Sequence, residues 1–494
     1  MRLFFGWLHS ALLWLYSSLL AATLILGAPY WLFRMATSGR YRAGLAGRLG
    51  RIPATLKTWA AENPAAAPAS HPILWLHAVS VGEVLVAARI VEEFARVLPS
   101  ARFAVSTTTA TGQALAQQRL PNCAVFYLPL DFRYAVRCYL NLLQPDLLVL
   151  IESELWPNLI AECAARRIPI AVANARISDR SFPRYLRLRR LWQPIFAQIS
   201  LFLAQSAETA ARLRQIAGPA LAARVHSTGN IKYDARAPQQ SRLTELIREA
   251  AAGRPILIAG STLGGDPLDE EASVIQAWKG ALRSQFKVLL VLAPRHPDRF
   301  SHVHSVALEF PTLLATEMLE GKRSEQALSG SARQDANPQV EILVLDTIGD
   351  LAALYALADA AFIGGSLVSR GGHNPLEPAQ FAVPVLIGPS YENFREIVET
   401  MRAADGIRIV QNKAAKQNQE AYKAVNEDSL EQALAELLTD RPTAQAIGLR
   451  GQSVFAAESG ATARTVAALL NLIPQALPPQ GTPEQTQTRR EGKR

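Results

Sequence analysis

The stretch that decides the fold is Ile73-Leu74-Trp75-Leu76-His77-Ala78-Val79-Ser80-Val81-Gly82-Glu83. It begins as an apolar run of strand length, and the apolar residues after Gly82 recur with helical spacing. The sequence therefore predicts a buried strand, a short turn and a helix. Open α/β sheets bind ligands at the carboxyl ends of such strands. Glu83 can cap the helix or face that crevice as a base, and the local pattern alone favours capping.

Similar apolar runs alternate with segments of helix length along most of the chain. Strands are predicted at 73–79, 103–107, 123–129, 147–152, 168–173 and 200–204, then at 255–259, 287–293, 340–345, 361–363 and 383–386. This alternation is typical of parallel, doubly wound sheets, and it pauses near residues 229–238. We predict an α/β protein of two Rossmann-like domains facing a cleft, one over residues 73–236 and the other over residues 237–473. Polar stretches at 319–338 and 411–428 are predicted to be surface loops.

The amino terminus is predicted to be a membrane anchor over residues 1–34. No charged side chain other than a possible His9 occurs between Leu3 and Arg34, and this run exceeds the ~20 residues that span a bilayer. A basic segment and linker over 35–72 follow, and the arginines there favour a cytoplasmic location for the domains. A cleaved signal peptide would have a shorter apolar region with positive charge before it. The pattern leaves open whether the helix spans the bilayer or lies in its interface.

Charge is distributed unevenly along the 494 residues. The net charge is +9, with 25 Lys+Arg and 12 Asp+Glu in residues 1–235 (+13) and 26 against 30 in the remainder (−4). The first half therefore favours an anionic partner, and the apolar amino terminus favours a membrane over nucleic acid. Cys123, Cys138 and Cys163 are odd in number and lie in apolar segments, which indicates reduced thiols. The tail over 474–494 is rich in Pro, Gln and Thr and is predicted to be disordered.

Two motifs of the first half suggest chemistry. Glu152-Ser153-Glu154 begins where a predicted strand ends, so its carboxylates would reach the same crevice as Glu83. Such a pair could hold a metal, but no further ligand stands nearby, which favours acid/base or hydrogen-bonding work. Six arginines occur from Arg176 to Arg190, and Arg180, Arg184 and Arg187 would share one helical face. Arginine forks match phosphate oxygens, so this patch is predicted to contact anionic lipid as bilayer or as substrate.

The second half has polar motifs at four predicted strand ends. They are Arg295-His296, Ile348-Gly349-Asp350, Gly364-Gly365-Ser366 and Gly371-Gly372-His373-Asn374-Pro375-Leu376-Glu377. Glycine turns and helix starts at strand ends are suited to binding a phosphate and a ribose. Glu377 could accept hydrogen bonds from ribose hydroxyls or cap its own helix. Together the four motifs predict a nucleotide site.

These motifs resemble those of the Kdo (3-deoxy-D-manno-octulosonic acid) transferases. The resemblance rests on His77-x-x-Ser80-Val81-Gly82-Glu83, Glu152-x-Glu154-Leu155-Trp156-Pro157-Asn158, Asn174-Ala175-Arg176, Thr228-Gly229-Asn230-x-Lys232, Pro294-Arg295-His296-Pro297 and the segment 371–377. It implies an inverting, metal-independent glycosyltransferase of the GT-B type that needs no cofactor. The implied donor is CMP-Kdo, the implied acceptor is a tetraacylated lipid A precursor, and the implied location is the cytoplasmic face of the inner membrane.

The resemblance also implies roles for single residues. Glu83 would be the general base, and Glu152 and Lys232 would stabilise the transition state. The implied CMP-binding residues are Arg295, His296, Ile348, Gly349, Asp350, Gly365, Ser366, Asn374, Pro375, Leu376 and Glu377. From charge and position we add an acceptor set of Ser80, Gly82, Arg176, Arg180, Arg184 and Arg187.

The sequence departs from the family pattern at the start of the second half. Leu263 stands where the family has a His after Ser-Thr, and Asp350 stands where it often has Glu. Two rival hypotheses remain at this point: a transferase of the same fold that uses another nucleotide sugar, and a membrane-anchored lipid- or nucleic-acid-binding protein built on a decayed transferase fold. The joint presence of Glu83, Glu152 and Lys232 disfavours the second.

Overall fold

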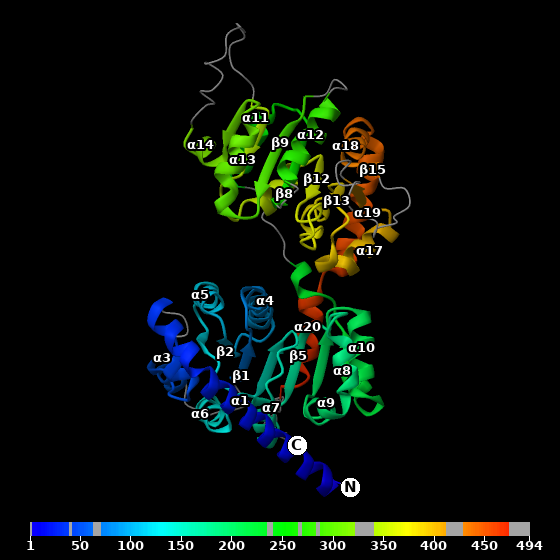
Figure 1. Cartoon of the computed structure of the whole chain (residues 1–494). Helices are drawn as coiled ribbons and strands as arrows, with labels where there is room; N and C mark the ends of the chain where they lie inside the picture. The colour runs from blue at the N-terminus through cyan, green and yellow to red at the C-terminus, as the bar shows by residue number, and fades with distance from the viewer. Residues whose placement is uncertain are drawn as a thin grey trace, which may run out of the picture. The chain divides into compact units, whose positions relative to one another are not determined.

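The computed structural model describes residues 2–38, 42–62, 71–234, 241–264, 269–282, 287–321, 340–411 and 428–473. It forms two compact units, Met1–Asp234 with Gly460–Arg494, and Ala235–Ser459 (Figure 1). The tail predicted over 474–494 and most of the predicted loops at 319–338 and 411–428 lie outside the described residues.

The first unit contains a seven-stranded sheet in the order β3-β2-β1-β4-β5-β6-β7, with every neighbouring pair parallel. Its strands are β1 (Ile73–His77), β2 (Arg102–Thr107), β3 (Ala124–Tyr127), β4 (Leu147–Ile151), β5 (Ile170–Ala175), β6 (Leu201–Ala204) and β7 (Val225–Ser227). Its helices are α1 (Arg2–Ser38), α2 (Leu45–Arg48), α3 (Ala54–Ala61), α4 (Val81–Val97), α5 (Ala110–Arg119), α6 (Arg133–Leu143), α7 (Pro157–Ala165), α8 (Phe182–Arg187), α9 (Arg189–Phe196), α10 (Ala207–Ala217) and α20 (Ala461–Leu470).

Helices cover both faces of this sheet, which explains why its strands are continuous apolar runs. Trp75 and Leu148 point to one face and pack with α6, α7, α9 and α10. Leu74 and Leu76 point to the opposite face and pack with α4, α5 and α20. Side chains alternate along a strand, so both neighbours in the sequence must be apolar here. The strand and helix predicted from the opening stretch are confirmed.

The second unit contains an eight-stranded parallel sheet in the order β10-β11-β9-β8-β12-β13-β14-β15. Its strands are β8 (Ile256–Thr262), β9 (Leu289–Pro294), β10 (Thr312–Leu314), β11 (Ile342–Val344), β12 (Ala360–Ile363), β13 (Val385–Ile387), β14 (Arg408–Gln411) and β15 (Asp428–Ser429). Its helices are α11 (Arg242–Ala251), α12 (Glu270–Leu282), α13 (Phe300–Ala307), α14 (Ala315–Leu319), α15 (Leu351–Leu354), α16 (Leu376–Ala379), α17 (Arg395–Ala403), α18 (Leu430–Thr439) and α19 (Arg441–Glu458). One buried cluster joins β8, β9 and β12 to α12, α13 and α18.

The last helix does not stay with the second half of the sequence. Val466 and Leu469 of α20 lie in the core of the first unit, where α20 packs on α4. The Asp234 carboxylate accepts hydrogen bonds from the backbone N–H groups of Gly460 (2.7 Å) and Thr462 (2.5 Å), which α20 leaves without partners inside the helix. The predicted second domain over 237–473 is therefore too long at its end, because an apolar helix returns to the first sheet.

The predicted linker is also partly folded. Residues 54–61 form α3, where Leu56 is buried and the Trp59 ring lies 3.8 Å from the guanidinium of Arg102. Arg48, one of the arginines expected near the membrane, lies 4.6 Å from the Tyr127 ring instead. The sequence did not predict this helix, because a segment rich in alanine and proline has few of the large apolar residues that indicate a core helix.

A buried carboxylate links α6 and α7. Glu162 forms ion pairs with Arg133 (2.9 Å), Arg137 (2.9 Å) and Arg166 (2.7 Å). Burial by itself would raise the pKa of Glu162, but hydrogen bonds from these three arginines lower the pKa to about 2. The carboxylate is therefore ionised at neutral pH and holds the two helices together.

Candidate active site

Glu83 lies in the first turn of α4, directly beyond the carboxyl end of β1. Only 7% of its surface is exposed. One carboxylate oxygen accepts a hydrogen bond from the backbone N–H of Val79 (2.8 Å), and the other accepts one from the Ser80 hydroxyl (2.9 Å). The capping geometry therefore exists, but it leaves lone pairs free on both oxygens.

The surroundings of Glu83 make its carboxylate more basic than an ordinary glutamate. Burial raises its pKa, the hydrogen bonds from Val79 and Ser80 oppose this rise, and the charges of Glu152 and Glu154 add to it. A methyl group added at Gly82 would meet no atom of the described residues within 4 Å. A partly desolvated carboxylate beside open space is suited to accept a proton from a bound ligand.

Glu152 and Lys232 form the second part of the site. Lys232 Nζ lies 2.6 Å from Glu152 Oε1, and the two side chains are 39% and 19% exposed. Glu152 directly follows β4 with φ of 62°, in the left-handed region that costs a non-glycine residue roughly 1–2 kcal/mol. This conformation turns the side chain at the strand end. The pair contributes a fixed cation and anion at the same sheet edge as Glu83.

Neighbouring strand ends hold Lys232 in place. Asn174, at the end of β5, accepts a hydrogen bond from the backbone N–H of Ile231 (3.0 Å), and Asn230 accepts one from the N–H of Lys232 (3.0 Å). Arg89 of α4 donates to the carbonyl of Ile231 (2.7 Å). The sequence resemblance included Asn174 and Asn230 in motifs, but their supporting role is visible only in the structure.

Two buried ring nitrogens near this edge have no hydrogen-bond partner among the described residues. They are His77 Nε2 and Trp156 Nε1, and the two rings lie 5.9 Å apart in an edge-to-face arrangement. The other nitrogen of His77 contacts the hydroxyl of Ser106 at 2.9 Å. Burial lowers the pKa of His77 to about 4, so the ring is neutral at pH 7. An acceptor and a donor left open in a buried place can bind a hydroxyl group or a water molecule.

The predicted arginine surface is only partly helical. Arg176 follows β5, Arg180 lies in the turn before α8, and Arg184 and Arg187 belong to α8. All four side chains are exposed. The prediction of one helical face with Arg180, Arg184 and Arg187 is wrong, because α8 begins only at Phe182 with Pro183 in its first turn.

In the second unit, a buried carboxylate fixes the Gly365-Ser366 loop. Glu270 accepts hydrogen bonds from four backbone N–H groups, those of Leu263 (2.8 Å), Gly365 (2.7 Å), Ser366 (3.0 Å) and Leu367 (2.8 Å). The predicted site omitted Glu270. Its signal in the sequence was the Glu270-Glu271 pair at a helix start, which reads as ordinary capping.

His373 and Leu263 flank this loop. A methyl group on Gly365, whose φ is 70°, would approach His373 Cδ2 to 3.1 Å and Leu263 Cδ1 to 3.4 Å. Burial, followed by the charges of Arg295 and His296, lowers the pKa of His373 to about 4. A neutral imidazole and the Leu263 side chain therefore both lie against the Gly365 turn.

The remaining nucleotide motifs lie at strand ends of the same sheet. Arg295 and His296 follow β9 and are exposed. Ile348, Gly349 and Asp350 precede α15, and the Ile348 side chain is 82% exposed. Pro375 and Leu376 are buried at the start of α16. Asn374 accepts a hydrogen bond from the backbone N–H of Leu376 (3.1 Å) and bonds the Glu377 side chain. Burial raises the pKa of Glu377, while Asn374 and Arg295 oppose the rise. An exposed apolar side chain, an arginine and a partly buried carboxylate are the groups that contact a base, a phosphate and a ribose.

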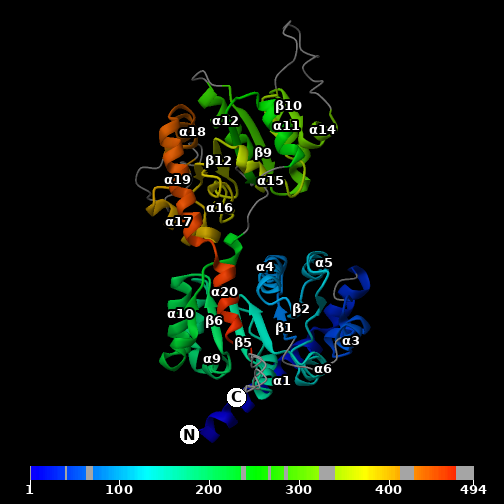
Figure 2. The same ribbon diagram turned by 180° about the vertical axis from the view of Figure 1, so that it is seen from behind.

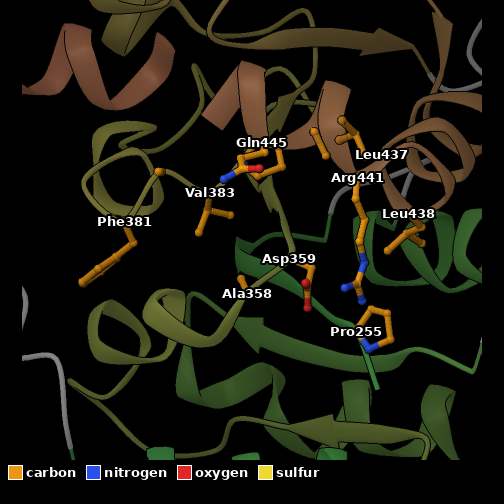
Figure 3. Close-up of a pocket in the computed structure, with 12 residues that line it drawn as sticks. Pro255, Ala358, Asp359, Phe381, Val383, Leu437, Leu438, Arg441 and Gln445 are labelled. Atoms are coloured by element: carbon orange, nitrogen blue, oxygen red, sulfur yellow. The ribbon is translucent and has the colours of Figure 1, made fainter. Parts of the chain in front are cut away.

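A cavity of about 260 Å³ lies elsewhere in this unit and is not this site (Figure 3). Pro255, Asp359 and Arg441 line it, and it adjoins the amino ends of β8 and β12. Ligands of open α/β sheets bind at the opposite, carboxyl ends.

Two Rossmann-like units, each with a parallel sheet and polar residues at its strand ends, define the fold of the GT-B type. The profile of the family described as 3-deoxy-D-manno-octulosonic-acid transferase (kdotransferase) matches residues 43–235. The chain is 32% identical over 403 residues to a 3-deoxy-D-manno-octulosonic acid transferase of Haemophilus influenzae, covering 81% of this chain and 86% of that protein. It is 32% identical over 453 residues to one of Bordetella pertussis, covering 89% and 94%. This chain belongs to the 3-deoxy-D-manno-octulosonic acid transferase family.

A solved structure shows the same fold at low identity. The protein from Listeria monocytogenes described as UDP-N-acetylglucosamine 2-epimerase superposes with a TM-score of 0.52 at 11% identity, covering 82% of this chain and 98% of that one. The predicted family, fold class and enzyme class are confirmed.

Proposed function

We propose that this chain transfers Kdo from CMP-Kdo to a lipid A precursor during lipopolysaccharide biosynthesis, by an inverting and metal-independent reaction. The observation that carries the proposal is the basic, buried carboxylate of Glu83 beside the Glu152–Lys232 pair. Family membership supports Kdo as the transferred sugar, and the resemblance of the motifs supports CMP as the nucleotide and a lipid A precursor as the acceptor.

The step we propose is a single displacement. Glu83 takes the proton of an acceptor hydroxyl, and the oxygen forms a bond to the anomeric carbon of Kdo. The bond from that carbon to the phosphate oxygen breaks, and its electron pair leaves with CMP. Attack on the face opposite the leaving group inverts the configuration. Such a base typically contributes about 10²–10⁴-fold to the rate.

The other residues hold and stabilise the reactants. Lys232, oriented by Glu152, offsets negative charge that develops on the leaving group. We assign the acceptor phosphates to the exposed arginines at 176, 180, 184 and 187, with Ser80 and Gly82 lining the approach to Glu83.

For the donor, we propose that the second unit binds CMP at its strand ends. Arg295 and His296 contact phosphate, the turn of Ile348, Gly349 and Asp350 contacts the base, and the Glu270-held loop of Gly365 and Ser366 contacts the sugar acid. The segment Asn374-Pro375-Leu376-Glu377 contacts the ribose. Neutral His373 lies against the same Gly365 turn as Leu263, and we propose that it supplies the hydrogen bond that the resemblance assigns to a histidine at position 263.

We further propose that the enzyme works at the cytoplasmic face of the inner membrane. Residues Ala11–Thr37 of α1 are long and apolar enough to cross a membrane, by length and composition alone. The basic first half would attract the anionic lipids of that leaflet.

Donor choice tests the proposal without the acceptor. Isothermal titration of the detergent-solubilised full chain with CMP, CMP-Kdo, UDP and UDP-N-acetylglucosamine should give binding of the two CMP ligands only. Glu377→Gln should weaken CMP binding, whereas Glu436→Gln, a change at an exposed carboxylate of α18, should leave CMP binding unchanged. Preference for a uridine nucleotide would overturn the donor assignment and favour a transferase for another nucleotide sugar.

A further inference from the structure

One side of α1 is half-buried from Leu13 to Met35. Half-buried positions recur every three or four residues, from Leu13 through Leu20, Leu24 and Trp31 to Met35, with exposed positions between them. This spacing places them on one stripe of the helix. The 23 residues from Leu13 to Met35 extend about 33 Å at a rise of 1.5 Å per residue. In both views α1 passes beside α6 (Figures 1 and 2), and a hydrogen bond joins it to Asn158 of α7.

A polar contact fixes α1 to the start of α7. The Ser17 hydroxyl accepts a hydrogen bond from Asn158 Nδ2 at 3.0 Å, and the Tyr16 hydroxyl bonds the buried carboxylate of Asp131. The same carboxylate accepts hydrogen bonds from the backbone N–H groups of Asn158 (2.9 Å) and Leu159 (2.8 Å). The anchor helix is therefore bonded to the group that caps α7, as part of the folded unit.

The opposite side of α1 is apolar and uncovered. Leu19, Ile25, Leu26 and Phe33 are 60%, 71%, 81% and 64% exposed, and no Asp, Glu, Lys or Arg occurs from residue 3 to 33. Soluble proteins rarely expose a continuous apolar surface of this length to water. The exposed side of α1 is therefore suited to contact lipid. An ordinary interfacial helix turns a polar side to water, whereas the other side of α1 packs on the first unit.

A membrane-spanning arrangement conflicts with the covered side. The part of α1 that could cross a bilayer, Ala11–Thr37, includes every half-buried position from Leu13 to Met35. The α6 and α7 helices would then enter the hydrocarbon with the ion pairs of Glu162 to Arg133 and Arg137. Each charge there costs several kcal/mol.

We propose that α1 lies in the plane of the membrane interface, with its outer side inserted into one leaflet, and does not cross the bilayer. The surface partner is the acyl and headgroup region of that leaflet, entered to a depth of roughly 5–10 Å. Both ends of the chain then lie on the same side of the membrane. This arrangement does not depend on which sugar the enzyme transfers.

The position of α1 has a consequence for the reaction, which rests on the proposed function. Asn158 follows Glu154 by four residues in the sequence. The hydrogen bond between Ser17 of α1 and Asn158 of α7 therefore holds the sheet edge that carries Glu152 near the lipid surface. A lipid acceptor could then offer its headgroup to Glu83 without leaving the leaflet.

Protease protection of terminal tags tests the topology. Full-length protein with one epitope tag at each terminus is placed in inside-out and right-side-out inner-membrane vesicles and treated with protease. We expect both tags to be cut in inside-out vesicles and both to be protected in right-side-out vesicles. An N-terminal tag that is cut only in right-side-out vesicles, or only after detergent is added, contradicts the proposal.

Two adjacent serines provide a matched pair of variants. Ser17 lies on the covered side of α1 and Ser18 on the exposed side. Ser17→Leu loses the bond to Asn158 and should lower the melting temperature by about 2–4 °C. Ser18→Leu should leave that temperature unchanged and should increase flotation with phosphatidylglycerol-containing vesicles. Equal effects of the two changes in both assays are expected of a spanning helix surrounded by lipid, and would overturn the proposal.

Discussion

Replacing Glu83 with Gln separates the two roles that this side chain combines. The carboxylate accepts hydrogen bonds from the Val79 N–H and the Ser80 hydroxyl. The amide oxygen of Gln can accept one of them, and the serine hydroxyl can turn to accept from the amide nitrogen. The structural cost is then about 1 kcal/mol for a weakened hydrogen bond, plus ~0.3–1 kcal/mol for the lost charge at a helix start.

The catalytic cost should be several times larger. Loss of a general base lowers turnover by about 10²–10⁴-fold, which corresponds to about 2.7–5.4 kcal/mol in the barrier. We expect Glu83→Gln to remain folded and to keep the CMP affinity of the unchanged chain. Product formation by mass spectrometry, CMP titration and the melting temperature measure the three quantities on one preparation.

A carboxylate of the same helix provides the control. Glu92→Gln changes an exposed residue of α4 and should leave turnover within about twofold. A loss of less than tenfold in Glu83→Gln would refute its role as the base. Parallel loss of CMP binding and turnover would show instead that the side chain is structural.

Four further outcomes follow from the same geometry. Lys232→Met should lower kcat by about 10²-fold with little change in KM, and Lys232→Arg should restore part of it, because Glu152 can hold either cation. Because burial raises the pKa of Glu83, kcat/KM should fall as pH drops through a pKa above the ~4.3 of an ordinary glutamate, and Glu83→Gln should remove that acid limb. The folded pKa of Glu162 is about 2, so its ionised form stabilises the fold above the unfolded pKa of ~4.3, and this stabilisation is lost as pH falls toward 2. Glu162→Gln should therefore lower the free energy of unfolding, measured with urea at pH 7, by about 1–3 kcal/mol, and by less at high salt. Glu377→Gln should weaken CMP binding by about tenfold in titration, with kcat less affected, because it alters a proposed ribose contact.

Apolar periodicity was sufficient to predict most of the fold. Strands such as β1 and β4 are buried on both faces, so their uninterrupted apolar runs give a clear signal. Strands β7, β10, β14 and β15 were missed because they have only two to four residues at or near the sheet edges. The return of α20 to the first unit was missed because a local pattern cannot show which sheet an apolar helix will cover.

Site residues were predicted where a motif directly follows a strand. Residues that hold the site through bonds to groups far away in the sequence were missed. Glu83, Glu152 and Lys232 lie at strand ends, and the structure pairs the last two directly. Glu270 and Asp131 bond backbone groups about 95 and 27 residues away in the sequence. Their chain neighbours carry no sign of these partners, so only the folded chain reveals that they fix the donor loop and α7.

The most direct test of the central claim is a transfer assay on the detergent-solubilised full chain with CMP-Kdo, a tetraacylated lipid A precursor and excess chelator. The account predicts a lipid product that carries one or more Kdo residues, an equal yield with and without chelator, and almost none from Glu83→Gln. Folded protein that binds CMP but forms no product would contradict the proposed acceptor. Product formation that stops with chelator, or that persists in Glu83→Gln, would contradict the mechanism.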